Sequence, residues 1–165
     1  MKGKGIDMIN LNIASSKPQA FAVIKGSEKY PDITGIAEFQ ETAKGVLLTV
    51  RVNGLPYTDE KCHNGIYGFH IHKGASCTGN ESDPFADTLT HYDPNNCPHP
   101  YHAGDLPPLF GNKGSAYMSV LTDRFTTDEI LGKTLVIHSM ADDFRTQPSG
   151  DSGEKIACGV IKHIN

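Results

Sequence analysis

Short runs of apolar residues, separated by turn residues, recur along most of the chain. In residues 46–52 every second residue is apolar, and the turn sequence Asn53-Gly54-Leu55-Pro56 follows. Alternation with a period of two is typical of a strand that buries one face. The pattern predicts strands over residues 20–25, 33–40, 46–52, 66–72, 115–121, 134–138 and 156–164.

Two long connections interrupt this series of strands. The first, residues 73–108, contains six prolines, which exclude a central strand because proline donates no backbone hydrogen bond. The second covers residues 139–155. Loops of this length inside a compact domain are usually functional or disordered, and four potential metal ligands in the first loop favour function.

Length and composition agree with a single all-β domain. A chain of 165 residues can bury a core of its own, and 17 glycines and 10 prolines fit many short strands joined by turns. We assign residues 19–165 to this domain and residues 1–18 to an N-terminal extension. The net charge of -4 and the scattered 15 basic residues argue against a nucleic-acid surface.

The N-terminal sequence and the cysteines bear on location. No stretch near the N-terminus has the roughly 7 to 15 apolar residues of a signal peptide, and none approaches the roughly 20 of a membrane span. We therefore expect a cytoplasmic protein that binds no membrane, although reducing cytosol disfavours disulfides. Three pairings are open to the four cysteines, which show no C-x-x-C spacing: Cys62, Cys77, Cys97 and Cys158.

Histidines carry the candidate chemistry. His70 and His72 lie two residues apart on a predicted strand, so their imidazoles point to the same face. His138 ends another predicted strand. An imidazole-rich site with an open position suits copper, which binds such ligands most tightly among the divalent first-row ions.

A second set of potential ligands lies in the first long loop. His91, His99, His102 and Asp105 are spaced by eight, three and three residues. Three imidazoles and one carboxylate make a closed tetrahedral zinc site. Since an imidazole has two nitrogens, His91 could serve both metals.

Taken together, these motifs resemble those of the copper,zinc superoxide dismutase family, over nearly the whole chain from about Gln19 onward. The resemblance implies a Greek-key β-barrel of eight strands with two long functional loops, a metal-binding loop and an electrostatic loop. This fold agrees with the predicted strands. The matching motifs are Gly68-Phe69-His70-Ile71-His72, His91-Tyr92-Asp93-Pro94, His102-Ala103-Gly104-Asp105-Leu106, Leu135-Val136-Ile137-His138 and Ala157-Cys158-Gly159-Val160-Ile161.

The resemblance also implies an activity and a set of ligands. Superoxide would be converted to dioxygen and hydrogen peroxide by alternate reduction and oxidation of copper, beside a structural zinc. The family also suggests a homodimer. By position, the copper ligands are His70, His72, His91 and His138, and the zinc ligands are His91, His99, His102 and Asp105, with His91 as the bridge that also delivers a proton.

Asp142 matches a family aspartate that hydrogen-bonds one copper histidine and one zinc histidine, here His70 and His99. Such a carboxylate orients the rings and determines which nitrogen is free to bind metal. The neighbouring Asp143 is the alternative partner. By the resemblance we predict that Asp142 has this role.

The four cysteines divide into two pairs by the same resemblance. Cys77 and Cys158 match the intrasubunit disulfide that joins the long metal loop to the last strand. Cys62 and Cys97 lie outside the common pattern. These two either form a second disulfide or remain free thiols.

Lys155 is the main departure from the family pattern. The family typically has an arginine at this position, beside the copper, where it helps to position superoxide. Lysine keeps the charge but lacks the planar fork of donors. We predict a catalytic role for Lys155 in attracting the anion, with Arg145 or Lys73 as further sources of charge; a solvated lysine at a strand start is the alternative.

Two rival functions remain open. A copper- or zinc-binding protein without dismutase activity, such as a metal buffer or delivery partner, is favoured by the change at Lys155, although the ligand set is complete. The spacing from His99 to His102 is also shorter than in many family members. A purely structural β-barrel module would keep its fold and function without metal.

Overall fold

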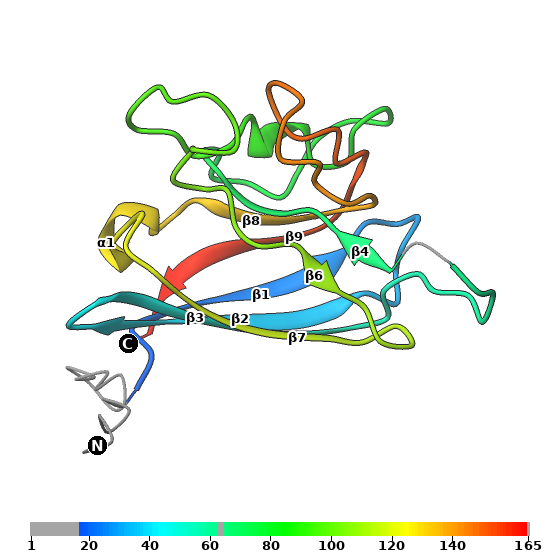
Figure 1. Ribbon diagram of the computed structural model, residues 1–165, viewed down its shortest axis with the longest axis horizontal. Coiled ribbons are helices and arrows are strands. Elements are labelled where there is room, and N and C mark those ends of the chain that lie inside the picture. The colour runs from blue at the N-terminus through cyan, green and yellow to red at the C-terminus, as the bar shows by residue number, and fades with distance from the viewer. Residues whose placement is uncertain (1–16, 63–64, 165) are drawn as a thin grey trace, which may run out of the picture.

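Nine strands and two short helices make up the part of the chain that the computed structural model describes, residues 17–62 and 65–164 (Figure 1). The helices are η1 (Ala86–Thr88) and α1 (Thr127–Ile130). The strands are β1 (Ala20–Gly26), β2 (Thr34–Thr42), β3 (Gly45–Asn53), β4 (Ile66–Tyr67), β5 (Phe69–His72), β6 (Leu109–Phe110), β7 (Ala116–Thr122), β8 (Thr134–His138) and β9 (Lys155–His163).

All seven predicted strands are present, with ends that differ by no more than two residues from those expected. The strand predicted over residues 66–72 is divided at Gly68 into β4 and β5. The sequence pattern missed β6, because it is only two residues long and follows Pro107-Pro108. Residues 1–16, which hold most of the predicted N-terminal extension, lie outside the described residues.

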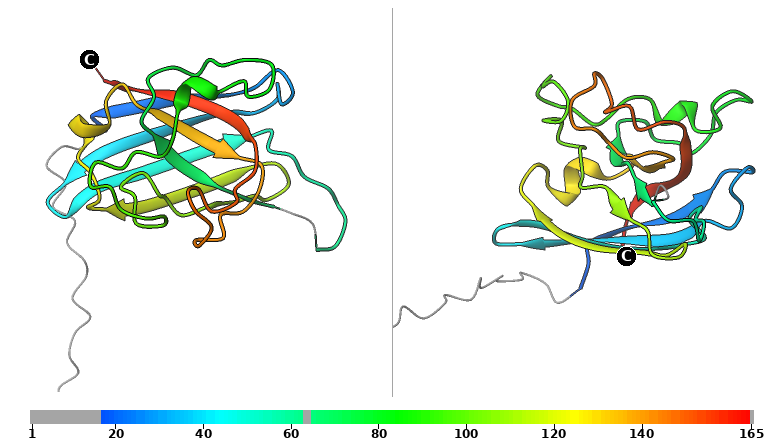
Figure 2. Two further views of the ribbon diagram at one scale, coloured as in Figure 1. Left: turned by 90° about the horizontal axis from the view of Figure 1, so that it is seen from above. Right: turned by 45° about the vertical axis from the view of Figure 1, so that its right-hand side comes forward.

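The strands form a curled antiparallel sheet of seven strands in the order β5-β8-β9-β1-β2-β3-β7, with a small sheet of β4 and β6 beside it. Three consecutive strands, β1 to β3, form a meander, whereas β7 returns to pair with β3 and β8 pairs with β5. Figure 2 shows the sheet curling around its interior. The all-β prediction is confirmed, and the topology is consistent with a Greek-key barrel.

Side-chain alternation along the strands separates the core from the surface. In β1 Ala22 and Ile24 are fully buried, whereas Val23 between them is 50% exposed. The core also receives large side chains from strands on opposite sides of the barrel, including Phe39, Leu48 and Ile137. Burying such a side chain stabilises the fold by about 1.5 to 3 kcal/mol relative to leaving it in water.

The two long connections lie on the same side of the barrel, next to β5 and β8 (Figure 1, green and orange). The sheet therefore serves as a rigid floor under two loops that are far apart in the sequence. Across residues 17–62 and 65–164, we find no helix with the length and apolar character needed to cross a membrane.

Candidate metal centre

The strand pair β5 and β8 supplies three of the buried histidines. In β5 Phe69 and Ile71 enter the hydrophobic core, so His70 and His72 point to the opposite face. His138, the last residue of β8, lies beside them because its backbone N–H donates to Gly68 O at 2.8 Å. Strand register alone thus gathers three imidazoles.

The free edge of β5 brings in the metal-binding loop. β5 is the last strand of its sheet, so its outer backbone groups are open to pairing. Ile71 N–H donates to Gly104 O at 2.9 Å, and Ile71 O accepts from Tyr92 N–H at 2.8 Å. These bonds place His91 opposite His72 and Asp105 opposite His70. The loop therefore lies in register with the strand that carries the first two histidines.

The first group comprises His70, His72, His91 and His138, whose candidate ligand atoms lie within 4.8 Å of one another. His72 Nδ1 lies 2.9 Å from Leu89 O and His138 Nδ1 lies 3.3 Å from Gly153 O. Because a carbonyl only accepts, both Nδ1 atoms carry the proton. The two Nε2 atoms, 3.3 Å apart, are left with their lone pairs facing the centre of the group.

The second group comprises His91, His99, His102 and Asp105, again with ligand atoms within 4.8 Å of one another. The Asp105 carboxylate lies 2.7 Å from His91 Nδ1, 3.1 Å from His99 Nδ1 and 3.2 Å from His102 Nδ1. All four residues are buried. His91 belongs to both groups, with Nδ1 toward the carboxylate and Nε2 on the other side of the ring.

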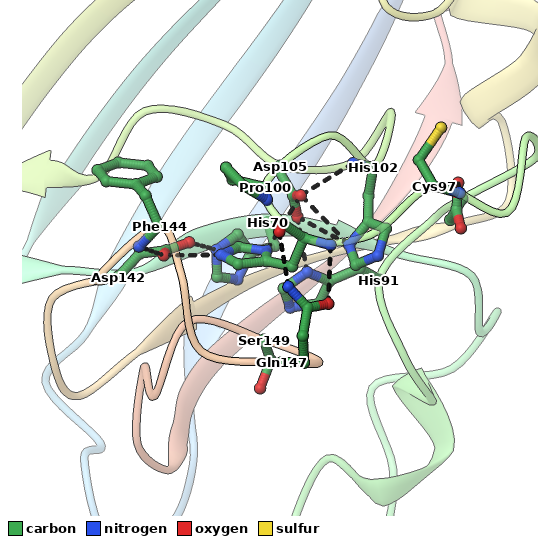
Figure 3. A network of polar contacts seen from close by, with 12 residues as sticks. His70, His91, Cys97, Pro100, His102, Asp105, Asp142, Phe144, Gln147 and Ser149 are labelled. Carbon is green, nitrogen blue, oxygen red and sulfur yellow. Dashed lines mark hydrogen bonds and ion pairs between the residues drawn. The ribbon is translucent and has the colours of Figure 1, made fainter.

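Asp142 connects the two groups from the second long loop (Figure 3). One carboxylate oxygen accepts from His70 Nε2 at 2.7 Å and the other from His99 Nε2 at 2.9 Å. Phe144 N–H also donates to the carboxylate. At Gly150, which has a φ of +71°, an added Cβ would lie 2.0 Å from Asp142 Oδ1, so this close approach requires glycine.

The alternative acid, Asp143, is used elsewhere. Its carboxylate accepts from the backbone N–H groups of Arg145 and Thr146, both at 2.8 Å, within its own turn. Two neighbouring acids therefore have different surroundings, one linking buried rings and the other closing an exposed turn.

Burial moves the pKa values of the group away from their ordinary range. The pKa of His70 falls to about 4 and that of His138 to about 3, mainly because burial disfavours the charged ring. Burial lowers the pKa of His72 as well. For Asp142 burial acts to raise the pKa, but hydrogen bonds, first from His70, outweigh it and lower the pKa to about 2. Neutral rings and a charged carboxylate are the forms that hold a cation.

Comparison with known proteins identifies the family. The family model for copper/zinc superoxide dismutase (SODC) matches residues 33–161. The chain belongs to this family. A Cu-Zn superoxide dismutase of Legionella pneumophila is 34% identical over an aligned length of 173, and the alignment covers 98% of this chain and 100% of the relative. One from Pasteurella multocida is 39% identical over 140 residues, 74% of this chain and 75% of the relative. The structure of the Cu/Zn superoxide dismutase from Brucella abortus matches with a TM-score of 0.70 and 27% identity, covering 86% of this chain and 99% of that one.

Two polar side chains that the sequence analysis did not identify hold the metal-binding loop of this superoxide dismutase family member. Gln147 accepts from His99 N–H at 3.0 Å and donates to His99 O at 2.7 Å, so one amide binds both backbone groups of His99. Arg124 Nη1 donates to the carbonyls of Pro100, His102 and Asp105 at 3.0 to 3.2 Å. Neither residue belongs to a local motif, because each acts across a long sequence separation.

Lys155 begins β9 beside the first group. A cavity of about 320 Å³ is lined by His72, His91, His138 and Lys155 among others. The Lys155 ammonium lies 2.7 Å from Asp83 Oδ2 and 3.1 Å from Phe85 O. Its charge is therefore paired, which the sequence analysis did not anticipate. Arg145 and Lys73 are exposed and lie outside this lining.

The structure confirms the predicted disulfide and answers the question left open for the other two cysteines. Cys77 and Cys158 form a disulfide across 81 residues of sequence, as the resemblance implied. Of the two alternatives left open for Cys62 and Cys97, the structure has the free thiols. Cys62 is exposed. Cys97 lies inside the metal-binding loop between His91 and His99, where its backbone N–H donates to the Asp93 carboxylate.

Proposed function

We propose that this protein is a copper,zinc superoxide dismutase that converts superoxide to dioxygen and hydrogen peroxide. The observation that carries the proposal is the placement of His91, one ring shared by two groups of four potential ligands. A single metal site would need only one nitrogen of this ring. Sharing supports a centre of two metals that communicate through one imidazole.

The donor sets support copper in the first group and zinc in the second. His70 Nδ1 and His91 Nε2 are buried nitrogens without a hydrogen-bond partner within the described part of the chain. A buried polar atom left unpaired is costly, and a bound cation would remove this cost. Four imidazoles suit copper, whereas three imidazoles and Asp105 suit a closed zinc site.

In the proposed reaction the metal and the side chains have different roles. Copper, when bound, supplies the one-electron oxidation and reduction. His91 lines the cavity, and its Nε2 is the atom that would hold and release one of the two protons that peroxide requires. Lys155, at the wall of the same cavity, would bind the incoming anion. Each of these two residues thus has a role that the other cannot fill.

Asp142 supports the centre without touching the substrate. Because both of its oxygens accept from histidine Nε2 atoms, it directs the Nδ1 atoms of His70 and His99 toward the two proposed metals. Zinc would be structural, orienting the His91 ring and adjusting its affinity for a proton.

Stopped-flow measurement of superoxide decay tests the proposal directly. Protein loaded with copper and zinc should accelerate the decay, and protein loaded with zinc alone should not. Equal rates in the two preparations would contradict the proposal. They would instead favour a metal-binding protein without dismutase activity, the second candidate, which the pairing of Lys155 with Asp83 supports.

Assembly, partners and location are further proposals. We propose a homodimer that binds neither nucleic acid nor membrane, and sedimentation equilibrium would measure its mass. A cytoplasmic location stays a prediction, and the Cys77–Cys158 disulfide counts against it, because such bonds persist mainly in oxidising compartments. Cell fractionation with a thiol-trapping reagent would distinguish the two locations.

A further inference from the structure

The ammonium of Lys155 has little freedom in this structure. It has three N–H donors. One donates to Asp83 Oδ2 at 2.7 Å and another to Phe85 O at 3.1 Å. The Lys155 side chain is only 16% exposed. One donor is thus left for a ligand, and Lys155 lines the cavity beside His72 and His138.

Asp83 is itself held in position to meet Lys155. Its Oδ1 accepts from Phe85 N–H at 3.0 Å, so its two oxygens have different partners. Its own N–H donates to Asn80 Oδ1 at 3.0 Å, and its carbonyl accepts from Asn80 N–H at 2.9 Å. The Asp83 side chain is 37% exposed, and these hydrogen bonds hold it within an ordered turn.

The disulfide connects this turn to the barrel. Phe85 packs with Val136 and Cys158 in a small buried cluster, against which Cys77 also lies. The turn that carries Asp83 follows Cys77 along the chain, and Lys155 lies three residues before Cys158 on β9. Both partners of the ion pair are therefore anchored close to the same covalent link.

We infer that Asp83 is a specificity-determining residue that sets how strongly the cavity attracts an anion. This inference rests on the proposed function, in which the substrate is a small anion. Asp83 holds the Lys155 ammonium in place but offsets much of its charge. Lys155 then contributes one oriented hydrogen-bond donor to the cavity, with only a weak net field.

The electrostatic consequence follows from Coulomb's law. A positive charge paired with a negative charge at 2.7 Å presents mainly a dipole to an ion farther away. Removing the carboxylate restores a full positive charge at the cavity wall. An asparagine cannot replace both contacts, since its amide offers one acceptor where Asp83 offers two.

Azide provides a probe of the anion site that does not depend on turnover. The protein loaded with copper and zinc is titrated with azide, and the copper(II) absorption band reports binding, for the wild type and for Asp83→Asn. We expect Asp83→Asn to bind azide about threefold to tenfold more tightly at low salt. The gain should shrink as ionic strength rises, because salt screens the newly exposed charge.

Two further variants separate the contact from its charge. Glu81→Gln removes the same charge from an exposed position two residues earlier, so it should change azide affinity by less than about twofold. Asp83→Ser removes the charge but keeps an acceptor for Phe85 N–H, so it should match Asp83→Asn. Copper content and thermal unfolding check that each variant is folded and loaded.

The outcomes separate this inference from the proposed function. Unchanged or weaker azide binding in both Asp83 variants, or an equal gain in Glu81→Gln, would overturn the inference while leaving dismutase activity intact. Tighter azide binding in a protein that does not accelerate superoxide decay would support the role of Asp83 and contradict the proposed function.

Discussion

The two halves of the candidate metal centre are built in different ways. His70, His72 and His138 lie on β5 and β8, which pair in register, so the sheet itself positions their rings. The zinc-side residues all come from one loop, residues 91–105, whose shape depends on side-chain contacts with Gln147 and Arg124.

This difference indicates which half should tolerate change. A ring on a paired strand keeps its place without metal, because backbone hydrogen bonds and core packing hold the strand. A ring on a loop depends on each contact that orders the loop. Loss of a loop contact at His99, which belongs to the zinc group alone, should therefore weaken zinc binding while leaving copper binding nearly unchanged.

The most disruptive test removes a strand-borne ring. His72→Ala should lower copper-dependent superoxide decay by at least about a hundredfold, because loss of a ligand costs no less than loss of an outer partner of a ligand. Zinc content should stay near the wild-type value. Stopped-flow decay and elemental analysis measure the two quantities. His163→Ala, at the exposed end of β9, is the control and should change neither.

Acid should destabilise the metal-free protein through its buried rings. The pKa of His70 is about 4 in the folded protein, well below its ordinary value of 6.5. The unfolded chain therefore binds more protons between these values, and stability falls as pH drops from 6.5 toward 4. For the His70 ring alone, the full decrease in the free energy of unfolding is about 3 kcal/mol.

Urea unfolding of the metal-free protein at several pH values measures this effect. His138→Gln should flatten the profile by removing one such ring, whose pKa in the folded protein is about 3. If the stability of the wild type does not change with pH, the histidines on β5 and β8 are exposed once metal is removed. That result would contradict the expectation that the strands hold these rings in place without metal.

Asp142 tests the connection between the halves. Asp142→Ala should weaken both copper and zinc binding by about 10- to 100-fold, because it frees a ring on each side. Competition with a chelator gives the two affinities. Asp143→Ala, next to it in an exposed turn, should leave both affinities within about twofold of the wild type. Loss of only one metal in Asp142→Ala would show that the halves are independent.

The smallest expected effect isolates the loop-borne half. Gln147→Ala removes both hydrogen bonds to the backbone of His99 and should weaken zinc binding by about tenfold, at about 1 kcal/mol or less for each bond. Copper affinity should stay the same. Glutamate at position 147 keeps the acceptor for His99 N–H, so Gln147→Glu should recover part of the loss. If Gln147→Ala weakened copper binding as much as zinc binding, the two halves of the centre would not be independent in this way.

Local patterns explain how much of this fold could be predicted. Alternation along residues 46–52 and the i, i+2 pair His70 and His72 depend only on strand geometry, so the strands and half of the centre could be anticipated. The two-residue β6 has no such pattern, and prolines precede it. Family motifs added the Cys77–Cys158 pairing, which spacing alone left open.

The sequence by itself determined the all-β class, the residues able to bind metal and the shared role open to His91, because these depend on residue type and short spacing. Only the tertiary structure decided that Asp142 and not Asp143 joins the rings, that Cys62 and Cys97 stay apart, and that Asp83 pairs with Lys155. The physical reason is distance along the chain. Asp83 and Lys155 are 72 residues apart, and no local pattern encodes a contact that forms only when two loops are folded against one sheet.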